Sequence, residues 1–525
     1  MKKILLSLAL AAAIMPAMAN DYTDDLQVSV NGVGFPSQKT TITVDRRTDG
    51  AYDFKLKNFS FAGMNIGDLN LDSVPGVEQD GVVYLAATRK VDVTIMFQKL
   101  TLPVTLRGEL LNNGGKLYAS MDIPVQALRQ NVSVLFGNGG YQIPNSGFED
   151  YHTEVLHNLA YDDDWNVTGW SADTLKSASV PNAWHSFMDA SGYSYDDNGN
   201  YYNNPAIIYL ASSMVEPHTY ISDEKRPGSA GSHSAKLIAR NAFIAIANGT
   251  MTTGRMNTGS TNAADVANHA WLDMDSTGTD TNGDPFYTVM NGRPDSLTVW
   301  VKYGQATPNA DHPYATVSAA ITDGTYYQEP DTNVYNNVYA IARNNTIEST
   351  NGEWKRLAIP FDVKDNSVKG KAILVTVSTN ADAGQGSDGD SILVDDINLV
   401  YNDPQNVNIN FSDNAVTVGD ADATVTYDGA NGPIIVKDFR QEGNDVVATV
   451  TVYNGDLTKQ IAQATHTFAN ATTGISKVVT DGAGNVSEVY DLSGRRVEAM
   501  QHGNVYIVRT ADGKTVKVLK QIDRR

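Results

Sequence analysis

Apolar and polar residues alternate in many short runs along the chain. The alternation is clear in Leu26–Val30, in Leu297–Tyr303 and in Trp354–Ile359. Successive side chains of a strand point to opposite faces of its sheet, so this period is typical of half-buried strands. Groups of Asn, Asp, Gly and Thr separate the runs, as turns separate strands. The pattern predicts an all-β protein, and the length of 525 residues predicts several domains.

The first predicted domain covers residues 20–138. Its short strands follow one another at hairpin spacing, at residues 26–30, 41–44, 52–56, 67–71, 91–97, 101–106, 116–123 and 132–136. A series of about eight such strands predicts a closed up-and-down β-barrel, which leaves no strand edge exposed.

Four segments of this domain resemble the calycin-like domain of Bacteroidetes exported proteins: Tyr22–Leu26, Val30–Gly32, Leu117–Ala119 and Phe136–Asn138. The resemblance implies a barrel whose mouth can hold a small apolar ligand. A small barrel filled by its own side chains is the alternative that we favour.

The second predicted domain covers residues 141–401 and contains all six tryptophans of the chain. Alternating strands within it predict a sandwich of two sheets. Three of its segments, Asn145–Glu149, Gly231–Leu237 and Val394–Ile397, resemble strands of galactose-binding-like jelly rolls, the fold of many carbohydrate-binding modules. The domain is most similar to the family named "putative carbohydrate metabolism domain" in secreted Bacteroidetes proteins.

The jelly-roll resemblance implies a structural calcium site. In galactose-binding-like modules, a glutamate of the opening strand and an aspartate of the closing strand lie side by side and bind the ion. The matching residues are Glu149 and either Asp395 or Asp396. Calcium prefers six to eight oxygen ligands, and two carboxylates that meet without a cation repel each other. The alternative is a pair of exposed carboxylates at strand ends.

The same resemblance implies a sugar-binding surface, in which an aromatic ring stacks on a sugar ring. Aromatic side chains gather in and beside a long loop rich in Tyr, Asp, Asn and Gly, and exposed aromatic groups of this kind often serve binding. The predicted ligand-binding residues are Trp184, His185, Tyr193, Tyr195, Tyr201 and Tyr202. The alternative for each of them is packing.

Two further domains are predicted. Residues 402–473 contain about five short strands and predict a small β-sandwich spacer. Residues 474–525 contain Val489–Val497, Gly503–Arg509 and Gly513–Lys520, three hairpin-forming strands before a basic tail. These strands resemble the C-terminal sorting domain of type IX secretion substrates, which implies delivery to the cell surface.

The N-terminus and the composition predict where the protein is located and argue against some classes of partner. Residues 1–19 have the charged start, apolar run and small-residue end of a signal peptide, which predicts export to the outer membrane surface or the extracellular space. The chain has no cysteine, so no disulfide stabilises it. Its net charge of −21 argues against nucleic-acid binding and against electrostatic attachment to anionic lipid. No later apolar stretch is long enough to span a membrane.

Catalytic motifs are absent from the sequence. It has no Gly-x-Ser-x-Gly, no His-Glu-x-x-His and no glycine-rich phosphate loop. Its nine histidines show no metal-ligand spacing, and Asp280–Asp284 predicts a solvated turn better than an EF-hand. The sequence therefore predicts non-catalytic glycan binding by the central domain. Three alternatives are a glycoside hydrolase or lyase in the same domain, an apolar-ligand carrier in the barrel, and a structural or adhesive surface protein with no small ligand.

Overall fold

The computed structural model describes residues 19–61, 64–95, 98–195, 201–203, 216–242, 245–275, 278–331 and 335–469, with shorter pieces at 478–479, 486–491, 494–497, 500–501, 505–510 and 515–519. Within these residues the regular elements are strands and three short 3₁₀ turns, so the all-β prediction is confirmed. No helix among them has the length and apolarity needed to cross a membrane. The predicted signal peptide lies outside the described residues except for Ala19.

The chain divides into two compact units. The first comprises Met1–Asn402 together with Ala430–Gly432 and Gly455–Thr458. The second comprises Asp403–Gly429, Pro433–Asn454 and Lys459–Arg525.

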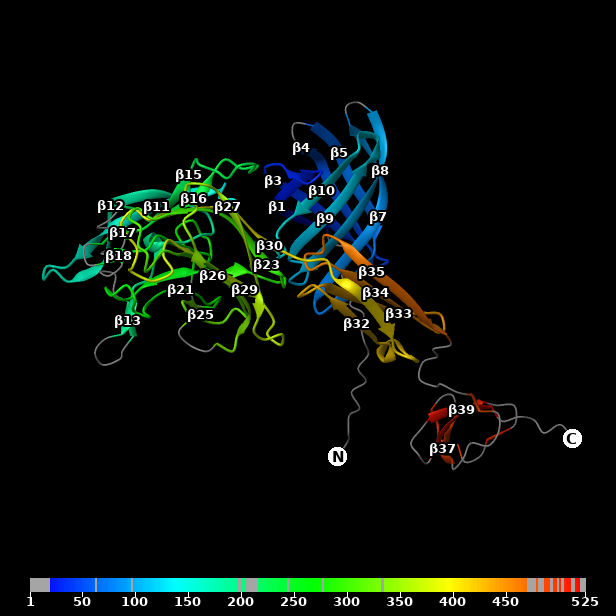
Figure 1. Cartoon of the computed structure of the whole chain (residues 1–525). Helices are drawn as coiled ribbons and strands as arrows, with labels where there is room; N and C mark the ends of the chain where they lie inside the picture. The colour runs from blue at the N-terminus through cyan, green and yellow to red at the C-terminus, as the bar shows by residue number, and fades with distance from the viewer. Residues whose placement is uncertain are drawn as a thin grey trace. The chain divides into compact units, whose positions relative to one another are not determined.

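The N-terminal part of the first unit is one antiparallel sheet that curls into a nearly closed barrel (Figure 1). Its strands are β1 (Ala19–Val30), β2 (Val33–Gly34), β3 (Gln38–Arg46), β4 (Tyr52–Phe61), β5 (Met64–Val74), β6 (Gly76–Gln79), β7 (Val82–Ile95), β8 (Gln98–Leu111), β9 (Lys116–Val125) and β10 (Gln130–Phe136). They pair in the order β5-β4-β3-β1-β10-β9-β8-β7-β6, and β2 adds to β1. Only Pro75 separates β5 from β6, so the chain itself joins the two ends of the sheet. The barrel prediction is confirmed.

Every second side chain of these strands points into the barrel. Leu26, Val28, Phe54, Val104 and Phe136 are fully buried there among further Leu, Ile and Val side chains. Burial of this apolar surface supplies the main stabilisation of the barrel. The interior is packed by the barrel's own residues, as in the alternative that the sequence favoured.

One barrel residue carries a buried carboxyl group. Glu109 of β8 is 1 % exposed, and its Oε2 accepts a hydrogen bond of 3.0 Å from the hydroxyl of Tyr141. Burial raises the pKa of Glu109 to about 7, although the Tyr141 hydroxyl opposes this shift. At neutral pH this group therefore titrates in the folded protein.

We expect the barrel to lose stability as the pH rises from 4.5 to 7. In this window the folded state holds a proton on Glu109 that the unfolded chain has already released, so higher pH favours unfolding. The full cost above pH 7 is about 3 kcal/mol. Glu109→Gln should remove this dependence, which urea denaturation followed by circular dichroism at pH 5 and pH 8 measures. Equal pH dependence in the wild type and the variant would contradict the assignment.

The central part of the first unit contains two antiparallel sheets. The first has the order β15 (Thr219–Ser222), β16 (Ser234–Ile238), β30 (Ser391–Val400), β23 (Ser296–Gly304) and β27 (Lys355–Pro360). The second has the order β19 (Thr250–Thr252), β29 (Ala372–Ser378), β24 (Ala315–Thr322), β26 (Val338–Ile347) and β28 (Asp362–Val363), with β22 (Thr288–Val289) beside β29. Side chains of both sheets, such as Val299 on β23 and Val317 on β24, share one buried core. The jelly-roll assignment of this sandwich stays a prediction.

Smaller elements surround the sandwich. They are the hairpin of β11 (Tyr151–Tyr161) and β12 (Val167–Pro181), the turn η2 (Phe187–Asp189), the pairs β13 (Tyr193–Tyr195) with β14 (Tyr201–Asn203) and β17 (Arg240–Asn241) with β18 (Ile246–Ala247), and the sheet of β20 (Arg255–Thr258), β21 (Asn268–Leu272) and β25 (Tyr327–Glu329). Among these elements, η2, β18, β20, β21 and β25 contribute to the walls of the candidate site. A strand that the sequence predicts at residues 206–211 lies outside the described residues.

The second unit contains only strands and one 3₁₀ turn in its described residues. These strands are β31 (Gln405–Phe411) with β32 (Ala423–Asp428), then β33 (Ile434–Glu442), β34 (Asp445–Tyr453) and β35 (Gln460–Phe468). A four-stranded sheet follows, with β36 (Val478–Val479), β37 (Val486–Tyr490), β38 (Val505–Thr510) and β39 (Thr515–Leu519). The turn η3 (Val418–Asp420) replaces a strand predicted at 416–418. The predicted sorting role of this region stays a prediction.

Candidate functional site

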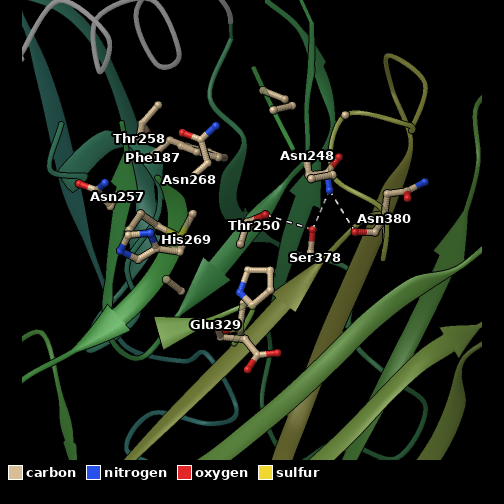
Figure 2. Close-up of a pocket in the computed structure, with 18 of the residues that line it drawn as sticks. Phe187, Asn248, Thr250, Asn257, Thr258, Asn268, His269, Glu329, Ser378 and Asn380 are labelled. Carbon is tan, nitrogen blue, oxygen red and sulfur yellow. Dashed lines mark hydrogen bonds between the residues drawn. The ribbon is translucent and has the colours of Figure 1, made fainter. Parts of the chain in front are cut away.

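A cavity of about 230 Å³ lies in the central domain, over the outer face of the second sheet (Figure 2). Its floor comes from β19, β24 and β29, and one wall comes from β20, β21 and β25. The segment from Ala245 to Asn248 and the loop that follows β29 form the opposite side.

The floor is polar because apolar side chains that point into the core alternate along each strand with hydroxyl side chains that point outward. On β29, Val375 and Val377 point into the core, so Thr376 and Ser378 point outward. The same alternation on β24 buries Val317. We call the outward hydroxyl residues of the three strands the pocket floor: Thr250, Thr316, Ser318, Thr376 and Ser378.

Hydrogen bonds orient the polar groups of the floor. The Oγ of Ser378 accepts from Asn248 Nδ2 at 3.2 Å and from Thr250 Oγ1 at 3.1 Å (Figure 2). The hydroxyl of Thr316 donates to Asn345 Oδ1 at 2.6 Å. These bonds reduce the rotational freedom of the hydroxyls, so the floor presents donors and acceptors in fixed directions.

Two titratable residues line the wall. His269 Nδ1 lies 2.8 Å from the carbonyl oxygen of Val266, and burial lowers the pKa of this histidine, which keeps the ring neutral at pH 7. Glu329 accepts hydrogen bonds through Oε2 from Arg343 at 2.7 Å and from the Tyr327 hydroxyl at 2.9 Å. Burial raises the pKa of Glu329, and Arg343 opposes this shift.

The aromatic residues that the sequence predicted as a sugar platform are placed differently from one another. Trp184 is 1 % exposed, and its ring packs 5.4 Å from that of Phe148 in the core. His185 is fully buried. These two rings have no exposed face for stacking on a sugar, and Trp184 has a packing role instead.

The tyrosines of the predicted platform belong to the β13–β14 pair. Tyr193 is half-buried, and its backbone N–H donates to Oδ1 of Asn257, a residue that lines the cavity. The side chains of Tyr195, Tyr201 and Tyr202 lie outside the described residues. Their contact with a ligand stays a prediction, on a hairpin that adjoins the cavity.

The predicted calcium residues lie at one corner of the sandwich. Glu149 is exposed and accepts hydrogen bonds from the backbone N–H groups of Ser232 and His233, just before β16. Asp395 lies on β30, beside the β16–β30 pairing of Ala235 with Val394. The structure therefore brings Glu149 and Asp395 to the same end of the sheet.

The two adjacent aspartates of β30 have different surroundings. Asp395 is buried, its Oδ2 accepts from the Arg226 N–H at 3.0 Å, and its Oδ1 has no hydrogen-bond partner. Burial raises the pKa of Asp395 to about 6, against the effect of the Arg226 N–H. Asp396 is half-buried and forms an ion pair of 2.5 Å with the Arg226 guanidinium. A buried oxygen without a partner fits a cation ligand, whereas Asp396 is already neutralised.

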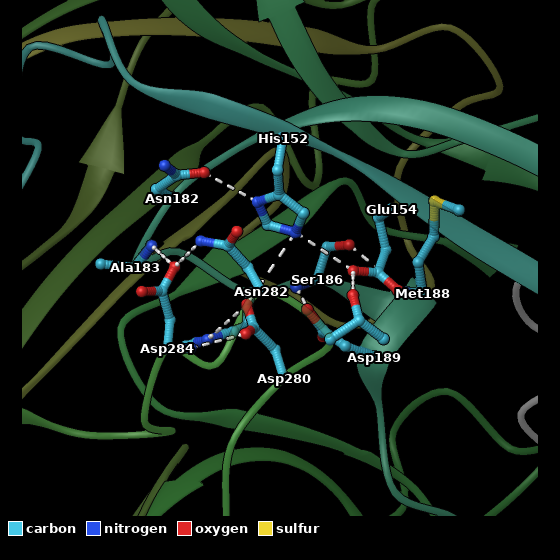
Figure 3. A network of polar contacts seen from close by, with 12 residues as sticks. His152, Glu154, Asn182, Ala183, Ser186, Met188, Asp189, Asp280, Asn282 and Asp284 are labelled. Atoms are coloured by element: carbon cyan, nitrogen blue, oxygen red, sulfur yellow. Dashed lines mark hydrogen bonds and ion pairs between the residues drawn. The ribbon is translucent and has the colours of Figure 1, made fainter.

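A second polar site lies beneath the β11–β12 hairpin (Figure 3). His152 of β11 reaches toward the turn at residues 280–284, and its Nε2 lies 4.0 Å from Asp280 Oδ2 and 3.2 Å from Glu154 Oε2. One nitrogen or oxygen atom from each of His152, Asp280 and Asp284 falls within 4.8 Å of the other two. We call these three residues the histidine–carboxylate cluster.

The three residues of this cluster are half-buried, and two carboxyl side chains at it are buried. The side chains of Asp280 and Glu154 are 1 % and 3 % exposed. Burial raises the pKa of Asp280, and the nearby Asp284 charge adds to this shift. Burial likewise lowers the pKa of His185 to about 4, so the His185 ring beside Asp280 is neutral at pH 7.

The turn predicted at residues 280–284 is present, and Thr281, Asn282 and Gly283 are exposed. Its first residue departs from the prediction, because the Asp280 side chain is buried against His152 and His185. The turn itself forms, because Asp280 Oδ1 accepts from the Asp284 N–H at 2.7 Å. No signal in the sequence connects residues 152, 185 and 280, since tertiary contacts such as the hydrogen bonds from Thr281 to Glu154 and from the Ala183 N–H to Asp284 bring these segments together.

Comparison with known proteins concerns mainly the barrel. No curated protein matches the chain. One solved structure with some similarity is described as a "putative glycoside hydrolase" from Bacteroides thetaiotaomicron, at 11 % identity and a TM-score of 0.32 over 66 % of this chain and 95 % of that one. A TM-score this low supports no conclusion about this chain. Residues 18–139 match the family described as "Calycin-like beta-barrel domain", so the N-terminal barrel built by β1 to β10 is a calycin-like barrel.

Proposed function

We propose that this chain is an exported surface protein whose central domain binds a glycan without catalysis, in the cavity above the pocket floor. The observation that carries the proposal is the chemistry of the lining. Hydroxyl and amide side chains stand at the floor and the rim among a larger apolar surface, namely Asn248, Thr250, Asn257, Thr258, Ser260, Thr261, Asn268, Thr316, Ser318, Asn345, Thr376, Ser378 and Asn380.

Such a lining suits a neutral polyhydroxylated ligand. Hydroxyl and amide groups both donate and accept hydrogen bonds, as sugar hydroxyls do. Alanines and the Phe187 ring add apolar surface for the C–H faces of a sugar. A cavity of about 230 Å³ is at the small end of ligand pockets, which favours one sugar unit or the end of a chain.

Glycoside hydrolysis is the second candidate. It needs two carboxylates on either side of the bond that is cleaved. Among the described residues that line the cavity, Glu329 is the sole acid, and it is already paired with Arg343. The raised pKa of Glu329 is the feature that favours a general acid. Release of product from a polysaccharide panel, abolished by Glu329→Gln, would establish hydrolysis instead of binding.

Export and surface attachment belong to the same proposal. They rest on the signal-like residues 1–19 and on the sorting-like strands after residue 474. Cell fractionation with an antibody against the central domain tests this part. Recovery of the protein in the cytoplasm would contradict it.

We expect Asn345→Ala to weaken glycan binding about tenfold, the effect of losing one hydrogen bond of about 1.4 kcal/mol. Asn345 is exposed at the rim, where its Oδ1 already accepts from Thr316. Isothermal titration of the full chain with a glycan selected from an array measures the change. Asn366→Ala, at an exposed position on the loop after β28, is the matched control and should bind like the wild type. Equal affinity of all three proteins would remove Asn345 from the site.

The predicted structural calcium remains a proposal, with Glu149 and Asp395 as its carboxylate ligands. The buried Asp395 Oδ1 without a partner supports it. We expect calcium to raise the melting temperature of the full chain, EGTA to lower it, and Asp395→Asn to abolish the difference. A melting temperature indifferent to calcium and to EGTA would argue against the site.

A further inference from the structure

The histidine–carboxylate cluster lies apart from the residues that line the cavity. Its three members come from distant positions, with His152 on β11 and Asp280 and Asp284 on the turn that precedes β22. Their candidate ligand atoms lie within 4.8 Å of one another. Figure 3 shows the His152 ring pointing down toward the turn, with the side chains of Asp280 and Asp284 below it.

A buried side chain without a partner points into this cluster. His185 is 0 % exposed, and neither of its ring nitrogens has a hydrogen-bond partner. Its Nε2 lies 3.6 Å from Asp280 Oδ2, which also lacks a hydrogen-bond partner. Leaving two such groups buried and unpaired is costly, and a cation held by both would satisfy them.

The surroundings of His152 prepare its Nε2 to act as a ligand. Asn182 Oδ1 lies 2.8 Å from Nδ1, so Nδ1 carries a proton and donates it. In the neutral ring Nε2 is then an acceptor, yet it faces Glu154 Oε2 at 3.2 Å and Asp280 Oδ2 at 4.0 Å. Acceptors that face one another repel unless a proton or a metal ion lies between them. A carbonyl group that fixes the far nitrogen is also the usual second partner of a metal-bound histidine.

The charge balance favours a cation. Glu154, Asp280 and Asp284 provide three carboxyl groups at the site. The cationic side chain on this side is Arg255, whose guanidinium lies 4.7 Å above the Phe286 ring. A bound divalent ion would offset the excess of negative charge.

We propose that His152, Asp280 and Asp284 bind a divalent transition-metal ion of the zinc type, with His185 as the nearest further ligand. Imidazole nitrogens suit zinc and its neighbours, whereas calcium takes oxygen ligands. Ligand atoms around tetrahedral zinc are about 3.3 Å apart. Asp280 Oδ2 lies 3.6 Å from His185 Nε2 and 4.0 Å from His152 Nε2, and the atoms of the cluster lie within 4.8 Å of one another, so binding requires inward shifts of up to about 1.5 Å. The ion would join the β11–β12 hairpin to the turn before β22 and so hold this side of the domain together.

Titration of the untagged full chain with Zn²⁺ by isothermal calorimetry tests the proposal. We expect one Zn²⁺ per chain with micromolar or tighter affinity. Asp280→Asn and His152→Gln should each weaken binding at least tenfold. His312→Gln removes a half-buried histidine that pairs with Asp382 elsewhere in the domain, and it should bind like the wild type.

A measurement on the wild type keeps the test independent of the folding of the variants. Crystals soaked in Zn²⁺ should give an anomalous peak at the zinc edge within bonding distance of His152 Nε2 and the Asp280 carboxylate. Absence of Zn²⁺ binding, equal affinity in folded Asp280→Asn, or a zinc peak elsewhere only would overturn the site. Glycan binding is measured separately, so failure of the metal site leaves the proposed function unaffected.

Discussion

Trp184→Ala should lower the free energy of unfolding of the central domain by about 3–5 kcal/mol. The ring is 1 % exposed and packs on Phe148 in a core that both sheets share, so its removal leaves a cavity. All six tryptophans of the chain lie in this domain, which makes tryptophan fluorescence a selective probe of its unfolding. Urea denaturation of the full chain, followed by this signal, measures the loss.

Trp165→Ala is the matched control. Trp165 is 81 % exposed, so its truncation should change the unfolding free energy by less than about 0.5 kcal/mol. Equal stability of the two variants would mean that Trp184 is not a core residue. The sugar-stacking role that the sequence suggested for it would then regain support.

Ala247→Phe should abolish glycan binding, with a loss of affinity of at least about a hundredfold. Ala247 lies on β18 and lines the cavity, so a phenyl ring at this position would take up space that the ligand needs. A loss of this size corresponds to about 2.7 kcal/mol of binding free energy. Titration with a glycan that binds the wild type measures the change.

Ala172→Phe controls for the added aromatic surface. Ala172 is exposed on β12 and does not line the cavity, so this variant should retain the affinity of the wild type. Unfolding monitored by tryptophan fluorescence should show that both variants are folded. Full affinity in a folded Ala247→Phe protein would place the ligand elsewhere.

The barrel could be predicted from the sequence because its order is local. Successive strands form hairpins, and inward residues such as Leu26, Val28, Phe54 and Leu56 alternate with polar ones. The period of the apolar residues and the spacing of the hairpins therefore suffice to predict the strands of the barrel. The main departure concerns β7 and β8, which are longer than predicted and pair over their whole length.

The β11–β12 hairpin could not be predicted in this way. Much of β12 is exposed or half-buried on both faces, so its sequence shows no clear alternation of apolar and polar residues. Acidic residues such as Asp173 interrupt it further. Backbone pairing with β11, rather than burial, establishes this strand.

The site depends on contacts between distant residues. The pocket floor combines β19, β24 and β29, whose order in the sheet follows from the tertiary fold. Its threonines and serines occupy the polar positions of alternating strands, where the sequence does not separate a binding surface from a solvated one. The burial of Trp184 likewise depends on Phe148, 36 residues earlier in the chain. The sequence located the domain and the tyrosine-rich segment, which it predicted as a loop and which forms the β13–β14 pair, but not the cavity itself.

A glycan array probed with the untagged full chain, with Ala247→Phe on the same array, tests whether the central cavity binds a glycan. We expect saturable binding of at least one neutral glycan by the wild type, with one site per chain, and loss of that signal in the variant. Silence of the wild type across a broad array, or an identical pattern for folded Ala247→Phe, would contradict it.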